Sequence, residues 1–294
     1  MSNQTRIVRL RDGHAVWTRC EGEGPIKLLL LHGGPGMTHE YLEPFSDFIQ
    51  GKPIQIIYVE ELGSYYSDQP DDPSLWNIPR FCDEVEDVRA AWQLDNFILY
   101  GQSWGGMLAM EYAIRYPQHL SGLIDSNMVD DLHDYETYIN QLRDAMAPAD
   151  VAYMKAKEAA NQTDDAHYQE LVLKLYHTCI CRCDPWPDAV NRSFDRLNEQ
   201  VYVTLQGPTE FTITGSLKTW SIRDRLPQIK VPTLVLGGKY DSMNPAVITA
   251  MAKRLPHGTA HICPQGSHFS IWDDQQDYFA AIEHFLQAVA PQND

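Results

Sequence analysis

The chain has 294 residues, of which 44% are hydrophobic and 21% charged, and its formal net charge is −17. This acidic balance argues against a nucleic acid or an anionic membrane as partner, because both bind basic protein surfaces. The length fits two domains, or one large α/β domain with an insertion, and it can bury a core without disulfides or metals.

No targeting or membrane segment is visible in the sequence. The first twenty residues contain four arginines and no apolar stretch of the kind that secretion signals carry. The longest apolar run, residues 26–31, is far shorter than a membrane span. Six dispersed cysteines are typical of a reduced protein. We therefore expect a cytoplasmic protein without membrane attachment.

Short, nearly continuous apolar runs recur along the chain and alternate with helical stretches. The runs lie at 27–31, 54–59, 97–100, 122–125, 233–236 and 259–262. The stretch 80–94 is typical of the helices, since its apolar residues are spaced four, three and four apart. Alternation of this kind predicts a mostly parallel sheet with helices on both faces.

The middle of the chain differs from both ends. From about residue 129 to 210 the pattern is helical, is rich in Ala, Gln, Asp and Tyr, and shows no strand. It ends at Gly207-Pro208, which has turn chemistry. We therefore expect a helical cap, residues 129–210, inserted into an α/β core formed by residues 1–128 and 211–294.

Gly101, Ser103 and Gly105 form a G-x-S-x-G pattern between the predicted strand 97–100 and a predicted helix, 105–116. A serine nucleophile on a strained strand-to-helix turn needs small neighbours, so that backbone and helix can pack closely. The backbone N–H after the serine then lies at a helix N-terminus, where it can stabilise an oxyanion. The pattern predicts that Ser103 is a nucleophile.

A second glycine-rich loop, residues 32–36, reads His-Gly-Gly-Pro-Gly and follows the first predicted strand. Its backbone can approach a ligand closely. The N–H of Gly34 is our candidate for the second oxyanion donor. We interpret His32 as a residue that orients this loop rather than as a catalytic base.

In this architecture the acid and the base follow the serine in the order Ser, Asp, His. Asp241 follows the predicted strand 233–236 through a glycine-containing turn, and His268 follows the predicted strand 259–262. Such positions at strand ends are where sites in open α/β sheets collect. We expect His268 to take the serine proton and Asp241 to orient the imidazole.

The alternative acid is Asp125, which ends an apolar strand 22 residues after Ser103. A carboxylate in that position is costly unless it is paired. In some proteins of this architecture the acid of the triad follows that strand. We prefer Asp241, because it has its own glycine turn.

Several segments together resemble the proline iminopeptidases, which are α/β-hydrolases with a helical cap. These segments are residues 32–36, 62–70, 101–106, 184–187 and 207–215. The likeness runs over nearly the whole chain. It implies an α/β-hydrolase fold and a serine hydrolase that releases an N-terminal residue, preferably proline, from short peptides, amino-acid amides or arylamides. It also implies no cofactor and no metal.

Carried over to this chain, the resemblance implies a triad of Ser103, Asp241 and His268. It also implies two oxyanion donors, the backbone N–H groups of Gly34 and Trp104. It further implies that Glu210 binds the free amine of the substrate. The chemistry supports this role, because an ammonium group needs a carboxylate at a fixed distance from the nucleophile. The alternative is that Glu210 is a solvated loop residue.

The chain departs from the family pattern near the substrate. Ser242 stands where some members have a second amine-binding glutamate, and Glu60-Glu61 stands where Asp-Gln is usual. Glu60 and Glu61 either replace the missing amine contact or face solvent. Tyr65 and Trp186 are candidates to line an apolar pocket for a proline-sized ring, or they are packing residues.

His177, Cys179, Cys181 and Cys183 invite a metal interpretation. Alternate spacing on a helix scatters side chains around the axis, and zinc sites favour two C-x₂₋₄-C pairs. We therefore expect packed thiols here and no metal site.

Two other functions remain open. One is an esterase, amidase or acyltransferase that uses the same triad with a retuned pocket. The other is a binding protein that has lost catalysis, and the complete Ser–Asp–His set argues against it. The expected partner is a small peptide or an amino-acid amide or ester; the sequence does not predict the oligomeric state.

Overall fold

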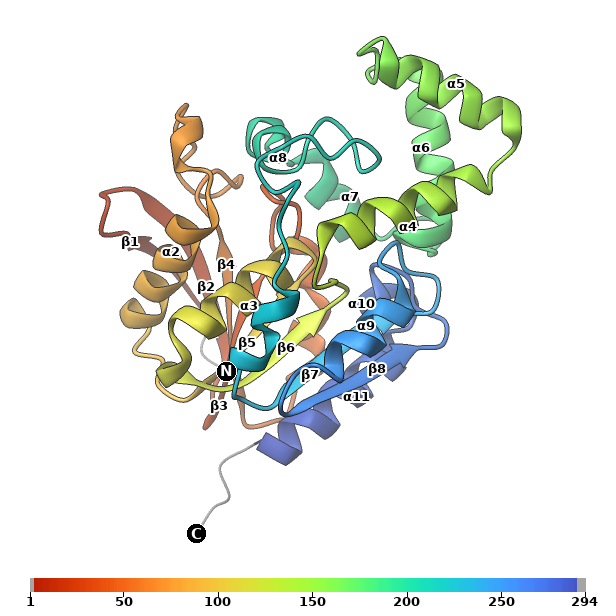
Figure 1. Cartoon of the computed structure of the whole chain (residues 1–294). Helices are drawn as coiled ribbons and strands as arrows, with labels where there is room; N and C mark the ends of the chain where they lie inside the picture. The colour runs from red at the N-terminus through yellow and green to blue at the C-terminus, as the bar shows by residue number, and fades with distance from the viewer. Residues whose placement is uncertain (1–2, 290–294) are drawn as a thin grey trace.

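A computed structural model describes residues 3–289, so residues 1–2 and 290–294 of the expected core lie outside the described residues. An eight-stranded sheet forms the centre, in the order β1-β2-β4-β3-β5-β6-β7-β8 (Figure 1). Its parallel strands are β3 (Ile26–Leu31), β4 (Ile54–Glu60), β5 (Phe97–Gln102), β6 (Leu120–Ser126), β7 (Thr233–Gly238) and β8 (Gly258–Cys263). These correspond to the six predicted apolar runs. Such runs are nearly continuous because strands covered on both faces bury most of their side chains, whereas the edge strand β8 leaves Thr259 and Ala260 exposed.

The first two strands were not expected from the sequence. β1 (Asn3–Arg9) and β2 (Ala15–Gly22) form an antiparallel hairpin, and β2 joins the sheet by pairing with β4. In β1 only Val8 is buried, while β2 buries every second residue. An exposed edge strand carries little apolar signal, which explains why the hairpin was missed.

Helices cover both faces of the sheet (Figure 1). Around the core they are α1 (Pro44–Phe48), α2 (Ile78–Ala91), α3 (Trp104–Arg115), α9 (Pro245–Ala252), α10 (Ser270–Asp273) and α11 (Gln275–Val289). On the face of α1 and α11, the ring of Phe45 lies 4.9 Å from Tyr100 and 5.2 Å from Phe279. α3 and α9 lie on the opposite face. None of the helices within residues 3–289 combines the length and the apolar character that crossing a membrane requires.

The region expected to form the cap is helical. It contains α4 (Leu132–Asp144), α5 (Pro148–Ala159), α6 (Ala166–Cys179), α7 (Asp188–Asp195) and α8 (Glu199–Leu205). These helices lie beyond the carboxyl ends of the parallel strands, with α5 and α6 farthest from the sheet (Figure 1). We propose residues 129–210 as a cap inserted between β6 and β7.

Candidate active site

Ser103 lies on a sharp turn between β5 and α3. Its backbone has φ 56° and ψ −123°, a strained conformation for a residue with a side chain. The turn is tight, because a Cβ at Gly101 would lie 2.0 Å from the carbonyl oxygen of Gly105. A Cβ at Gly105 would lie 2.4 Å from the carbonyl oxygen of Leu31. The two glycines of the sequence pattern therefore allow α3 to start against β3 and β5.

The candidate oxyanion donors lie beside this turn. Trp104 is the first residue of α3, and both Trp104 and Gly34 line the same cavity as Ser103. The loop of Gly34 is fixed by Tyr41, whose hydroxyl accepts a 2.5 Å hydrogen bond from the N–H of Gly33. The same hydroxyl donates to Oε1 of Gln102 at 2.8 Å. The glycine-rich loop is thus tied to the residue that precedes Ser103.

His32 is buried under the same loop and does not line the cavity that the structure describes. Its Nδ1–H donates to the carbonyl oxygen of Gly33 at 2.8 Å, and its Nε2 accepts from the N–H of Glu61 at 3.2 Å. Burial lowers the pKa of this imidazole. A neutral ring with both nitrogens occupied orients the loop, as the sequence interpretation held.

Asp241 and His268 come together from the loops that follow β7 and β8. Nδ1 of His268 lies 2.9 Å from Oδ1 of Asp241. The amide of Asn127 donates to Oδ2 of Asp241 at 2.6 Å, and the N–H of Met243 donates to Oδ1 at 2.9 Å. Sequence reasoning missed Asn127, although an asparagine that closely follows the predicted strand 122–125 was an available signal. The structure gives Asn127 a φ of 55°, which asparagine tolerates well.

Ser103 and His268 line one cavity of about 570 Å³. Within residues 3–289, neither the Ser103 hydroxyl nor Nε2 of His268 makes a hydrogen bond to another residue. Catalytic hydrogen bonds are often long without substrate and tighten only in the complex. Neither atom is therefore occupied by another described residue, and both residues face the same cavity.

Asp125 does not contact His268. It is fully buried, and neither of its carboxylate oxygens has a hydrogen-bond partner in the described part of the chain. Its Oδ1 faces α3, 2.3 Å from the position that a Cβ on Gly106 would occupy. Burial raises the pKa of this carboxyl well above its ordinary value. The geometry favours Asp241 over Asp125 as the acid.

Glu210 lines the same cavity as Ser103. The hydroxyl groups of Tyr135, on α4, and Tyr202, on α8, both donate hydrogen bonds to its carboxylate. Burial, and then the charge of Glu210, raise the pKa of both phenols well above the ordinary value. Two neutral donors therefore fix the carboxylate and leave it accepting capacity for a cation.

Known proteins resemble this chain over most of its length. A family model described as the alpha/beta hydrolase fold matches residues 27–275. The chain is 44% identical to the proline iminopeptidase of Flavobacterium johnsoniae over 279 residues, which cover 93% of this chain and 94% of the relative. It is 45% identical to that of Elizabethkingia meningoseptica over 280 residues, with the same coverage. The chain belongs to the proline iminopeptidase family of α/β-hydrolases.

Solved structures agree with this membership. The crystal structure of VinJ matches with a TM-score of 0.93 and 28% identity, covering 97% of this chain and 99% of VinJ. The crystal structure of the proline iminopeptidase from Mycobacterium smegmatis matches with a TM-score of 0.90 and 28% identity, covering 98% and 99%. The predicted fold and the resemblance to proline iminopeptidases are confirmed.

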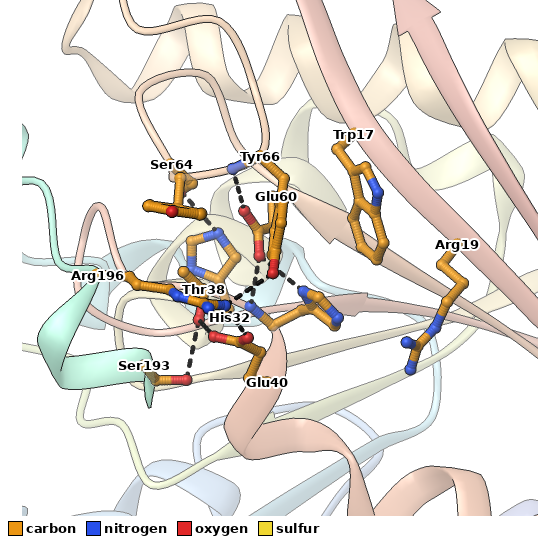
Figure 2. A network of polar contacts seen from close by, with 12 residues as sticks. Trp17, Arg19, His32, Thr38, Glu40, Glu60, Ser64, Tyr66, Ser193 and Arg196 are labelled. Carbon is orange, nitrogen blue, oxygen red and sulfur yellow. Dashed lines mark hydrogen bonds and ion pairs between the residues drawn. The ribbon is translucent and has the colours of Figure 1, made fainter. Parts of the chain in front are cut away.

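Glu60, a departure from the proline iminopeptidase pattern, does not reach the cavity. Its carboxylate is buried at the end of β4 (Figure 2), where it lies 2.7 Å from Nδ1 of His39 and accepts the N–H of Tyr66 at 2.8 Å. Burial raises the pKa of Glu60 to about 7 and lowers that of His39 to about 3. Both alternatives for Glu60 are corrected: the carboxylate neither reaches the cavity nor faces solvent, and it holds the loops around it instead.

Glu61 is likewise buried and away from the cavity. Its Oε2 accepts a hydrogen bond from the indole Nε1 of Trp104 at 2.7 Å. Burial, and then the charge of Glu84, raise the pKa of Glu61 well above its ordinary value. Both alternatives, a substrate contact and solvent exposure, are corrected here too. Glu61 holds the side chain of the residue whose backbone N–H is a candidate oxyanion donor.

Tyr65 and Trp186 are not among the described residues that line the cavity. Tyr65 is half-exposed, and the guanidinium of Arg196 lies 4.7 Å from its ring. Trp186 donates from Nε1 to the carbonyl oxygen of Cys181 at 2.8 Å, and its ring packs 5.3 Å from Phe194. The expectation that these two side chains line the substrate cavity is therefore corrected. The aromatic lining comes instead from Trp104, Tyr135, Tyr168, Tyr176, Phe194, Tyr202 and Phe269.

Proposed function

We propose that this chain is a serine hydrolase that releases an N-terminal residue, proline or another small apolar amino acid, from short peptides and aminoacyl amides. Its relatives are named proline iminopeptidases. The observation that carries the proposal is the single cavity lined by Ser103, His268 and Glu210. It combines a nucleophile, a base and a carboxylate that can hold an ammonium group.

In the first step, the Ser103 oxygen attacks the carbonyl carbon of the scissile bond while Nε2 of His268 takes the hydroxyl proton. Asp241, 2.9 Å from Nδ1, stabilises the imidazolium that forms. The carbonyl oxygen becomes an oxyanion, which accepts hydrogen bonds from the N–H groups of Trp104 and Gly34.

In the second step, the tetrahedral intermediate expels the leaving amine, and the imidazolium of His268 gives that amine its proton. The N-terminal residue is then an ester on Ser103. Water attacks this acyl-enzyme with His268 as base, the free amino acid leaves, and the serine regains its proton. No cofactor takes part in these steps.

Glu210 limits the reaction to substrates with a free amine. Its carboxylate pairs with the substrate ammonium, which fixes the distance between the amine and the carbonyl that Ser103 attacks. An N-acylated substrate brings a neutral amide to the same carboxylate and leaves it without a charged partner. We propose that Glu210, on the cap, gives the enzyme its exopeptidase character.

The test compares Glu210→Gln with Glu199→Gln, because Glu199 also lines the cavity but is exposed at the start of α8. Each variant is assayed on prolyl p-nitroanilide and on p-nitrophenyl acetate, which has no amine. We expect Glu210→Gln to lose kcat/KM by roughly 100-fold on the prolyl substrate only, and Glu199→Gln to keep both activities. An equal loss on both substrates would show that Glu210 does not anchor the substrate amine.

The location is proposed as the cytoplasm. Its support is the set of six free cysteines, which suits a reducing compartment. Fractionation of cells that express a tagged chain tests it, with recovery in the cytoplasmic fraction as the expected result.

A further inference from the structure

Near its carboxyl end, β8 carries a histidine and a cysteine, two residue types that bind metal ions, on the same face of the sheet. β8 is the last strand of the sheet, and its residues His261 and Cys263 are two positions apart. Side chains in a strand alternate between faces, so these two point to the same side. That side is covered by α11, whose first turn carries Asp277. Sequence reasoning sought ligands at helical and C-x₂₋₄-C spacings and so missed this group.

The three side chains converge in space. Nε2 of His261 lies 2.6 Å from Oδ2 of Asp277, and one ligand atom from each of the three residues lies within 4.8 Å of the other two. Cys263 is fully buried, while the side chains of His261 and Asp277 are each 36% exposed. The group is therefore closed on its sulfur side and open to solvent on the other, so that an ion can enter.

The donor set selects the ion. Nitrogen, sulfur and carboxylate oxygen together suit Zn²⁺, whereas Mg²⁺ and Ca²⁺ prefer oxygen ligands alone. Donors around a tetrahedral Zn²⁺ lie about 3.3–3.6 Å apart, given its usual bond lengths. To bind the ion, Nε2 of His261 and Oδ2 of Asp277 would have to move about 1 Å farther apart, and the sulfur of Cys263 would have to move closer by a similar amount. Rotations of these side chains can supply both movements.

The surroundings favour a cation. His261 also lines a second cavity, of about 380 Å³, together with His257 and His284. The residues that line this cavity come mainly from β8 and α11, the two elements that carry the proposed ligands. The chain as a whole carries a net charge of −17, which raises the local concentration of cations.

We propose that His261, Cys263 and Asp277 bind one Zn²⁺ ion, with a water molecule as the fourth ligand. Binding releases the thiol proton to solvent, so that a thiolate and a carboxylate balance the charge of the ion. Without the ion, His261 pairs with Asp277, and the thiol of Cys263 is hydrogen-bonded to the same carboxylate and to Ser270.

Cys263 is hydrogen-bonded to the two loops that carry Asp241 and His268 of the candidate triad. The carbonyl oxygen of Cys263 accepts hydrogen bonds from the N–H groups of Lys239, at 3.0 Å, and Gly266, at 3.2 Å. Lys239 begins the turn that reaches Asp241, and Gly266 precedes His268. An ion that ties Cys263 to α11 therefore stabilises the ends of β7 and β8, and it is not required for the hydrolytic steps.

Cobalt provides the test, because a thiolate bound to Co²⁺ gives an ultraviolet charge-transfer band. The purified chain is stripped with a chelator, dialysed and titrated with Co²⁺. We expect a band that saturates at one equivalent, is displaced by Zn²⁺, and is absent from Cys263→Ser. Cys183→Ser, which removes a half-buried thiol elsewhere, keeps the band.

Two further variants cover the case in which Cys263→Ser fails to fold. His261→Ala and Asp277→Asn change partly exposed residues and should weaken Co²⁺ binding by at least about tenfold. Zn²⁺ should also raise the melting temperature of the wild type and leave that of Asp277→Asn unchanged. Absence of the band in the folded wild type, or an unchanged affinity in both variants, would overturn the proposal, whatever the hydrolytic activity.

Discussion

Asn127 holds Asp241 from the side opposite His268. Its amide donates to Oδ2 of Asp241 at 2.6 Å and to the carbonyl oxygen of Ser267 at 3.1 Å. One side chain thus fixes both the acid and the loop that carries the base. The bond to Asp241 is charge-assisted, a class worth more than a neutral hydrogen bond.

Asn127→Gly removes this amide while keeping a residue that accepts the positive φ. Loss of a charge-assisted hydrogen bond costs about 1.5–3 kcal/mol, so kcat on prolyl p-nitroanilide should fall roughly 10- to 100-fold. Asn161→Gly is the matched control, because Asn161 also has a positive φ and is exposed on the cap. Equal kcat values in the two variants would show that Asn127 does not position Asp241.

Asp125 and Asp241 are the two candidate acids, and steady-state kinetics separate them. Asp241→Asn should lower kcat by about 10⁴-fold, because the imidazole loses the carboxylate that orients it and stabilises its charge. Asp125→Asn should keep kcat near the wild-type value, since Asp125 contacts α3 rather than His268. The reverse pattern would assign the acid to Asp125.

The buried carboxyl of Asp125 should also make the unfolding free energy depend on pH. Its pKa is raised in the folded chain, so above about pH 4 the unfolded chain releases this proton first. The contribution of Asp125 to the unfolding free energy is present at low pH and is lost as the pH rises towards the folded pKa. Urea unfolding between about pH 4 and 8 should show Asp125→Asn gaining stability relative to the wild type as pH increases. A difference that does not change with pH would contradict this.

Much of the fold could be predicted from the sequence, and specific residues show why. The central parallel strands were visible because residues such as Leu28–Leu31 are apolar without interruption, as strands buried on both faces must be. The hairpin of β1 and β2 was not visible, because its outer strand exposes all but Val8. The cap was expected as a helical block, but the contacts of its helices with the core depend on tertiary packing.

The candidate site was predictable where local geometry dictates residue type. Gly101 and Gly105 are needed for the tight turn, and Asp241 and His268 follow buried strands. Glu60 was misplaced because a residue at the end of a strand can turn towards the cavity or under the neighbouring loop. Which of these occurs depends on partners such as His39, distant in sequence.

Glu61 is predicted to act as a neutral acid that holds Trp104. Burial raises its pKa and so favours the neutral form, and a glutamine keeps an acceptor oxygen, so Glu61→Gln should retain the activity. Glu61→Leu leaves the indole N–H buried without a partner, which should cost about 1–3 kcal/mol of unfolding free energy. The kcat of Glu61→Leu should also fall, because a shifted Trp104 side chain moves the backbone N–H of Trp104 away from the oxyanion.

The control for Glu61 is a second carboxylate–indole pair, remote from the cavity. Nε1 of Trp220 donates to Oε1 of Glu111 at 2.8 Å. Glu111→Leu should lower stability, measured by urea unfolding, and leave kcat unchanged. A fall of kcat in both leucine variants would indicate a general loss of structure rather than a role for Glu61 in positioning Trp104.

Covalent labelling of Ser103 tests the central claim most directly. The folded chain is incubated with a fluorophosphonate, digested, and analysed by mass spectrometry, with Ser103→Ala and His268→Ala as controls. The account predicts one adduct on the peptide that contains Ser103, complete loss of hydrolysis as labelling saturates, no adduct in Ser103→Ala, and slow labelling in His268→Ala. Hydrolysis of prolyl p-nitroanilide that persists after Ser103 is fully labelled, or an adduct on another residue that abolishes it, would contradict the account.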